Sequence, residues 1–175
     1  MNHKLNDALF YLIKSSVIAI AFYIVASLLP MEKLTSDVTA ALLRMCGIHA
    51  VSYEENGRIF LEYLSISIDC TALEIIAIFL GLILAASSTV PKKTGFALFI
   101  SLAVFFVNVA RIGIVYYLLE KGIPWWLAHD LFSGVLSIGA GMIFLLLSEH
   151  YLPSINQHLY TLLDAAESAI RSRTR

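Results

Sequence analysis

Charged residues are scarce in this chain of 175 residues: Asp, Glu, Lys and Arg make up 14%, whereas hydrophobic residues make up 59%. A soluble domain usually carries about 25% charged residues, and a soluble chain of this size could not bury so much apolar surface. The net charge of −1 leaves no basic patch for nucleic acid. The composition therefore excludes an ordinary soluble domain, a disordered chain and a nucleic-acid-binding protein, and it predicts a small polytopic membrane protein.

Cysteine is rare as well, and the two present, Cys46 and Cys70, cannot build a disulfide framework or a four-ligand zinc site. The histidines are scattered without HxxxH spacing, so no metal or organic cofactor is implied. A cleavable signal peptide is not expected, because the apolar run after Lys14 is too long and ends at Pro30 without a small-residue cleavage site.

Long apolar runs predict an all-α membrane protein with a single integral-membrane domain over residues 1–175. Each run is close to the ~20 residues that a helix needs to cross a bilayer. The four predicted spans are residues 9–29, 71–88, 94–119 and 127–147. Residues 30–69 then form a segment outside the membrane.

Basic residues in short loops set the predicted orientation, because such residues stay on the cytoplasmic side. Lys92 and Lys93 join the second and third spans, so they should be cytoplasmic, and four spans put both termini on that side. Trp125 and Trp126 start the fourth span, where interfacial aromatic residues are common. Seven basic residues then lie on the cytoplasmic side: Lys4, Lys14, Lys92, Lys93, Arg171, Arg173 and Arg175. Four lie on the external side: Lys33, Arg44, Arg58 and Lys121.

Smaller elements are predicted outside the spans. In the external segment we expect a short helix over residues 36–46, with Ser36 or Asp37 as its N-cap, and then a β-hairpin around Asn56-Gly57. Residues 153–175 space their apolar side chains as an amphipathic helix does. This helix is predicted to lie on the cytoplasmic membrane surface, with its arginines at the lipid headgroups.

Polar residues interrupt the apolar runs, where a central Arg costs ~2.5–3.5 kcal/mol on the insertion scale. At about 1.5 Å of rise per residue, Cys70, Arg111 and His129 each lie about 26–27 Å above the cytoplasmic end of their span. Three predicted helices thus bring a thiol, a guanidinium and an imidazole to one level near the external surface. One turn deeper, a second polar layer follows on the same helix faces: Glu74, Asn108 and Ser133.

This combination suits nucleophilic catalysis by a cysteine. An ordinary thiol has a pKa of about 8.5 and needs help to ionise, which a nearby Arg111 cation or a protonated His129 would supply. His129 could also carry protons to and from the reacting groups, and Arg111 could instead hydrogen-bond an oxyanion. Glu74 or Asn108 could hold Arg111 from below. Asp130 is a poor candidate to orient His129, because adjacent helical residues point about 100° apart.

At these positions the sequence resembles the exosortase/archaeosortase family of membrane cysteine transpeptidases, in a short form. In that family a Cys is followed by a small polar residue and usually Gly, an Asn-x-x-Arg lies on the next helix, and a His opens a later one. Ala72 departs from this pattern, because it stands where members usually have Gly. The matching blocks, in the family's order, are Asp69-Cys-Thr-Ala-Leu-Glu, Asn108-Val-Ala-Arg-Ile and His129-Asp-Leu-Phe-Ser-Gly.

The resemblance implies that Cys70 is the nucleophile and that Arg111 and His129 complete a triad. The implied substrates are secreted proteins that end in a short sorting motif, a transmembrane helix and a basic tail. The cysteine would cleave at the motif, hold the product as a thioester and pass it to a membrane lipid or another surface acceptor. The residues expected in supporting positions are Glu74, Asn108, Asp130 and Ser133.

The residues alone leave other interpretations open. A peptidase of the same architecture would only hydrolyse its thioester, and a non-enzymatic scaffold or small transporter subunit would use Arg111 and Glu74 as a structural ion pair. Cys46 and Cys70 could form a disulfide, since both are predicted to be external. The predicted hairpin could bind an extended sorting motif by strand addition or act as a lid. A close helix-packing face is predicted at Gly134, Gly139 and Gly141.

Overall fold

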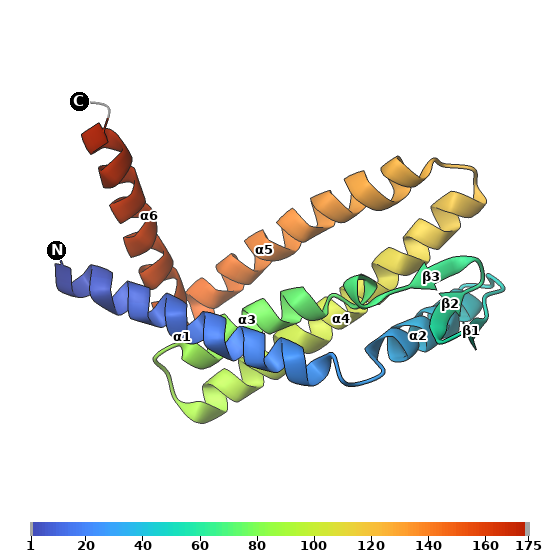
Figure 1. The fold of residues 1–175 in the computed structure, drawn as a ribbon, viewed down its shortest axis with the longest axis horizontal. Coiled ribbons are helices and arrows are strands. Elements are labelled where there is room, and N and C mark those ends of the chain that lie inside the picture. The colour runs from blue at the N-terminus through green and yellow to red at the C-terminus, as the bar shows by residue number, and fades with distance from the viewer. Residues whose placement is uncertain (1, 174–175) are drawn as a thin grey trace.

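The computed structural model describes residues 2–173, and most of them are helical (Figure 1). A 3₁₀ turn, η1, precedes α3, and a π-helical segment, η2, leads directly into α5. The elements in chain order are α1 (Asn2–Ala26), α2 (Met31–Met45), β1 (Ser52–Glu55), β2 (Arg58–Leu61), β3 (Leu64–Ile66), η1 (Ile68–Thr71), α3 (Leu73–Ala85), α4 (Val90–Glu120), η2 (Trp126–Leu131), α5 (Phe132–Tyr151) and α6 (Ser154–Arg173).

Three helical stretches within residues 2–173 are long and apolar enough to cross a bilayer: His3–Ala26, Val90–Glu120 and Trp126–Tyr151. The chain is therefore a helical membrane protein with three candidate spans. α3 was predicted as a full span over residues 71–88, but it has only 13 residues. It rises about 20 Å, against the ~30 Å of a hydrocarbon core. The predicted count of four spans is thus not confirmed.

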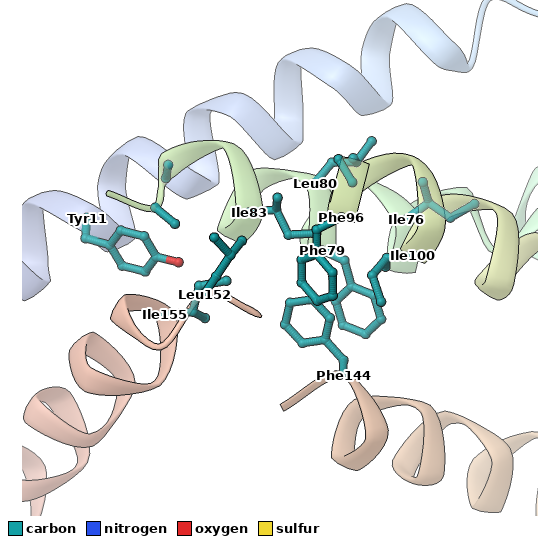
Figure 2. Packing of buried hydrophobic residues seen from close by; sticks show 13 residues of the cluster. Tyr11, Ile76, Phe79, Leu80, Ile83, Phe96, Ile100, Phe144, Leu152 and Ile155 are labelled. Atoms are coloured by element: carbon teal, nitrogen blue, oxygen red, sulfur yellow. The ribbon is translucent and has the colours of Figure 1, made fainter. Parts of the chain in front are cut away.

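α3 is nevertheless the buried centre of the helical part, lying beside α1 and α4 (Figure 1). Gly81 lets α1 approach closely, because a Cβ there would lie 2.9 Å from Cβ of Ala19. Figure 2 shows the core cluster at the end of α3 that is distant from the sheet. In it the rings of Phe79 and Phe144 stack with their centroids 4.0 Å apart, and the side chains of Leu152 and Ile155 are buried. The cluster fixes α5 and α6 against α3 at this end.

The other half of α5 lies away from α3 (Figure 1), and side chains such as Val135 and Ile138 are exposed. A Cβ built on Gly134, Gly139 or Gly141 would meet no atom of the described residues within 4 Å. The predicted close packing at these glycines is therefore not formed within residues 2–173.

A three-stranded antiparallel sheet in the order β1-β2-β3 caps the opposite end of the helices. The predicted hairpin is confirmed: Asn56 and Gly57 connect β1 to β2 with φ angles of 51° and 74°, as a type I′ turn requires. β3 was not predicted; Glu62 and Tyr63 connect it to β2, and Glu62 also has a positive φ of 51°.

α2 packs against this sheet and starts earlier than predicted, at Met31 directly after Pro30. Ser36 and Asp37 therefore lie inside the helix and do not cap it. The Ser36 hydroxyl instead donates to the carbonyl oxygen of Phe60 in β2 at 3.2 Å. Asp37 forms an i,i+4 ion pair with Lys33 at 3.3 Å. Buried residues of α2, the sheet and α4 form a second cluster: Ala40, Leu43, Ala50, Leu61, Leu64, Ile66, Ile112 and Tyr116.

The predicted C-terminal helix is present as α6, which leaves α5 after Leu152 and contacts α1. His158 stacks on Tyr11 with ring centroids 4.5 Å apart. Asn156 is buried and accepts a hydrogen bond from Ser148 at 2.9 Å. Arg175, predicted to reach the lipid headgroups, lies outside the described residues. α1 begins and α6 ends at the end of the molecule that is distant from the sheet (Figure 1).

Candidate active site

A pocket of about 330 Å³ lies between the sheet and the helices, and it holds the three residues predicted to meet at one level. Cys70 comes from η1, Arg111 from the middle of α4, and His129 from η2. The other lining residues are Leu64, Ser65, Ile66, Ser67, Asp69, Ile112, Val115 and Trp125. Three separate segments thus place a thiol, a guanidinium and an imidazole around one cavity.

The backbone at Cys70 is held by hydrogen bonds on both sides. Its N–H donates to the carbonyl of Ser67 at 2.9 Å, and its own carbonyl accepts from Nδ2 of buried Asn108 at 2.6 Å. The Ser67 hydroxyl lies 3.6 Å from Sγ of Cys70. Glu74 or Asn108 was expected to support Arg111 from below, but in the structure the amide of Asn108 holds the main chain of Cys70.

Ala72 separates η1 from α3 and adopts the left-handed conformation, with φ 56° and ψ 17°. This conformation explains why α3 begins only at Leu73, although the apolar run starts earlier. Left-handed backbone is unfavourable for a residue with a Cβ and is readily adopted by glycine. The geometry gives a reason for the glycine that the family usually has at this position.

Arg111 is half-buried in α4 and lines the same pocket as Cys70. Its Nε is buried and has no hydrogen-bond partner among the described residues. Glu74 is exposed, and within residues 2–173 no ion pair joins it to Arg111. The expected support of Arg111 by Glu74, and the structural pair that a scaffold would use, are therefore not formed.

His129 is fixed by two neighbours on its own segment. Its Nδ1 lies 2.9 Å from Oδ1 of Asp130, and its ring stacks on Trp125 with centroids 4.5 Å apart and planes inclined by 11°. Asp130 was expected to be a poor candidate to orient His129, because adjacent residues of an α-helix point about 100° apart. In the structure its carboxylate nevertheless contacts Nδ1 of His129, and both residues lie in a π-helical segment. π-Helical segments often occur at functional sites.

The predicted second layer is only partly assembled around the pocket. Asn108 contacts Cys70, but Glu74 and Ser133 do not line the cavity. The Ser133 hydroxyl is buried without a hydrogen-bond partner in the described part of the chain. Sequence reasoning missed Trp125 as a pocket residue, because a Trp at the start of a span was interpreted as an interfacial anchor. Its spacing of four residues from His129 was the available signal.

The cysteines are both free, Cys46 exposed on the end of α2 and Cys70 half-buried in the pocket. The alternative of a Cys46–Cys70 disulfide is therefore not found. No cluster of three or more His, Cys, Asp or Glu side chains that could hold a metal ion occurs in the described residues. The pocket itself brings together a thiol, a guanidinium and an imidazole that contacts a carboxylate.

The fold and the site together define a helical membrane protein with a pocket that contains a Cys, an Arg and a His. Comparison with protein families identifies it further: the family model for transmembrane exosortase matches residues 4–148, so the chain belongs to the exosortase family. The resemblance inferred from the three sequence blocks is thus confirmed. No curated protein and no solved structure matches the chain.

Proposed function

We propose that this exosortase is a cysteine transpeptidase that cleaves the C-terminal sorting signals of secreted proteins and transfers them to a lipid or another surface acceptor. The observation that carries the proposal is the convergence of Cys70, Arg111 and His129 on one pocket. The substrates would be secreted proteins with a short sorting motif, a transmembrane helix and a basic tail, as the family resemblance implies. The chemistry needs no cofactor.

In the first step, the thiolate of Cys70 attacks the carbonyl carbon of the scissile peptide bond. Arg111 stabilises either the thiolate before attack or the oxyanion that forms afterwards. The C–N bond then breaks, and the leaving amine takes a proton from His129. The product is a thioester on Cys70 and a released C-terminal fragment.

In the second step, the acceptor loses a proton to His129 and attacks the thioester carbonyl. The C–S bond breaks, and Cys70 returns to its starting state. The orientation of the imidazole supports this role. With its proton on Nδ1, His129 donates to the Asp130 carboxylate at 2.9 Å, and Nε2 is left to exchange protons with the reacting groups.

The proposed location is the cell membrane, with both termini in the cytoplasm and the pocket at the external face. Two features support it: Lys92 and Lys93 lie at the start of α4, and α1 begins and α6 ends at the end of the molecule opposite the sheet (Figure 1). Cys46 tests this orientation, because it is exposed on α2 beside the sheet. A membrane-impermeant maleimide should label Cys46 in intact cells. Labelling only after lysis would contradict the orientation.

The activity can be tested with a membrane reporter in which a folded external domain is followed by a short randomised segment, a transmembrane helix and a Lys/Arg tail. We expect the wild-type protein to cleave a subset of these reporters and Cys70→Ala to cleave none. Cys46→Ala is the matched control, because Cys46 lies outside the pocket, and it should cleave normally. Cleavage that survives Cys70→Ala would reject the proposal.

The mass of the product's new C-terminus distinguishes the two enzymatic alternatives. An added lipid or amine shows transfer to an acceptor, whereas a free carboxylate shows that water resolves the thioester. The second outcome would leave a membrane cysteine peptidase that attaches nothing. Wild-type protein that cleaves no reporter would favour a non-enzymatic role.

A further inference from the structure

β3 is an edge strand that leads towards the candidate nucleophile. It pairs with β2 on one side, with Leu61 opposite Leu64 and Ile59 opposite Ile66. Its other side has no strand beside it, since the sheet order is β1-β2-β3. The chain continues from Ile66 through Ser67 into η1, which carries Cys70. The open edge of the sheet therefore points to the reaction centre.

The hairpin geometry shows which backbone groups of β3 are free. In a two-residue hairpin, the residues that flank the turn are hydrogen-bonded to each other, and the next pair is not. Leu61 and Leu64 flank the turn, so Phe60 and Ser65 form the non-hydrogen-bonded pair. The N–H and C=O of Ser65 thus face away from β2, and no other segment of residues 2–173 bonds to them.

Two hollows meet at this edge. Ser65, Ile66 and Ser67 line the pocket that contains Cys70, and the same three residues line a neighbouring hollow of about 490 Å³. Charged side chains from α2 and the β1–β2 hairpin line the second hollow: Glu32, Lys33, Glu54 and Arg58. A bound chain that follows the edge would therefore pass directly from polar surroundings into the reactive pocket.

We propose that the free edge of β3 binds an extended segment of the substrate as a fourth strand, directly before the bond that Cys70 attacks. This inference rests on the proposed function, and it names the part of the protein that holds the sorting segment. Two main-chain hydrogen bonds to Ser65 supply binding that does not depend on sequence, while the lining side chains select residues, as in other cases of strand addition.

The direction of the added strand follows from the proposed orientation. The substrate chain comes from the external side and continues into the membrane as its transmembrane helix. β3 likewise runs from the sheet towards α3. The two chains therefore pair in parallel, so the Ser65 N–H donates to one substrate carbonyl, and a substrate N–H two residues further on donates to the Ser65 carbonyl. Held in this way, the scissile carbonyl approaches Cys70 in a fixed geometry.

Removal of the Ser65 N–H tests the proposal. Ser65→Pro deletes a donor that β2 does not use, and proline is tolerated on edge strands with the N–H side facing outward. Ser65→Ala, which keeps the N–H, is the reference variant. Compared with it, Ser65→Pro should lower cleavage of the randomised-segment reporter about tenfold, which corresponds to one hydrogen bond of about 1.4 kcal/mol. Ser52→Pro and Ser52→Ala form the matched pair on the opposite edge, because Ser52 is an outward-facing residue of β1 and lines neither hollow, and they should cleave alike.

Two measurements keep this inference separate from the proposed function. Alkylation of Cys70 by iodoacetamide needs no substrate strand, so an unchanged rate in Ser65→Pro shows an intact pocket. If Cys70→Ala abolishes cleavage but Ser65→Pro and Ser65→Ala cleave alike, strand addition is wrong and the transpeptidase proposal stands. If the wild-type protein cleaves no reporter, the proposed function itself fails.

A substrate-side test avoids the risk that Ser65→Pro misfolds. A synthetic peptide that covers a cleaved segment is scanned with single amide-to-ester replacements, each of which removes one N–H. With wild-type protein, one position shortly before the cleaved bond should lose about tenfold in rate. Equal cleavage of every ester-containing peptide would overturn the proposal.

Discussion

Asp130 holds the imidazole of His129 from the neighbouring position in the chain, with Oδ1 2.9 Å from Nδ1. Both residues lie in the π-helical segment η2. The Asp130 side chain is 64% exposed, so the pair adds little to stability, since exposed ion pairs contribute about 0–1 kcal/mol. Its consequence is orientation: the carboxylate selects the tautomer that leaves Nε2 free.

Asp130→Asn should therefore lower reporter cleavage roughly tenfold, a fraction of the ~10²–10⁴-fold that general acid–base catalysis contributes. The melting temperature should hardly change. The matched control is Asp7→Asn, because Asp7 forms a similar exposed contact with His3 at 2.8 Å, far from the pocket. Equal activity of Asp130→Asn and Asp7→Asn would show that the carboxylate does not act on His129 during the reaction.

Trp125 should contribute to activity, whereas its neighbour Trp126 should not. Trp125 lines the pocket and stacks on His129, while Trp126 is 61% exposed and does not line it. An aromatic pair is worth about 0.5–1.5 kcal/mol beyond its buried area, so Trp125→Ala should lower cleavage about threefold to tenfold. Trp126→Ala should cleave as the wild type does. A similar loss in both variants would indicate a general membrane-anchoring role and no specific support of His129.

Asn108 is predicted to hold the nucleophile's main chain in place. Asn108→Ala leaves the part-buried carbonyl of Cys70 without its 2.6 Å hydrogen bond, which should cost about 1–3 kcal/mol of stability and reduce cleavage. Asn156→Ala is the control, because Asn156 is also buried and donates to the Leu145 carbonyl at 3.0 Å, at the other end of the molecule. Because Asn156 also bonds to Ser148 and Glu149, Asn156→Ala should destabilise at least as much, yet leave the alkylation rate of Cys70 unchanged.

Features with a local chemical cause could be predicted from the sequence. The Asn56-Gly57 turn is an example, because both residues accept the positive φ that a type I′ turn demands. The placement of Cys70, Arg111 and His129 in one pocket followed from helical rise and the cost of polar groups in a bilayer.

Features that depend on unusual backbone could not be predicted in this way. The apolar run from residue 71 gave no sign that Ala72 adopts a left-handed conformation or that α3 ends at Ala85, so the length of α3 was overestimated at both ends. The turn at Glu62 has a positive φ without a glycine or asparagine, and β3 was therefore missed. The apolar run from residue 127 also gave no sign of the π-helical segment η2, in which Asp130 contacts His129.

Arg111 should make Cys70 more reactive towards alkylating reagents. Arg111 lines the same pocket as Cys70, and a nearby cation favours the thiolate, the form that reacts. In native membranes at neutral pH, Arg111→Ala should slow iodoacetamide alkylation of Cys70 several-fold, and Arg111→Lys, which keeps the charge, should slow it less. Exposed Cys46 is the internal control within the same molecule. A parallel change at Cys46 would point to altered folding or access.

Ala72→Gly should stabilise the protein, although glycine in a helix usually destabilises. At φ 56° Ala72 lies in the left-handed region, where a Cβ costs about 1–2 kcal/mol. Glycine removes this strain. It also gives the unfolded chain more conformational freedom, which offsets part of the gain. We expect a gain of up to about 1 kcal/mol, seen as a higher melting temperature in detergent. Ala77→Gly, a buried position inside α3, should shift stability in the opposite direction by about 1 kcal/mol or more. If both variants destabilise, the left-handed conformation at Ala72 is not the one that the folded protein adopts.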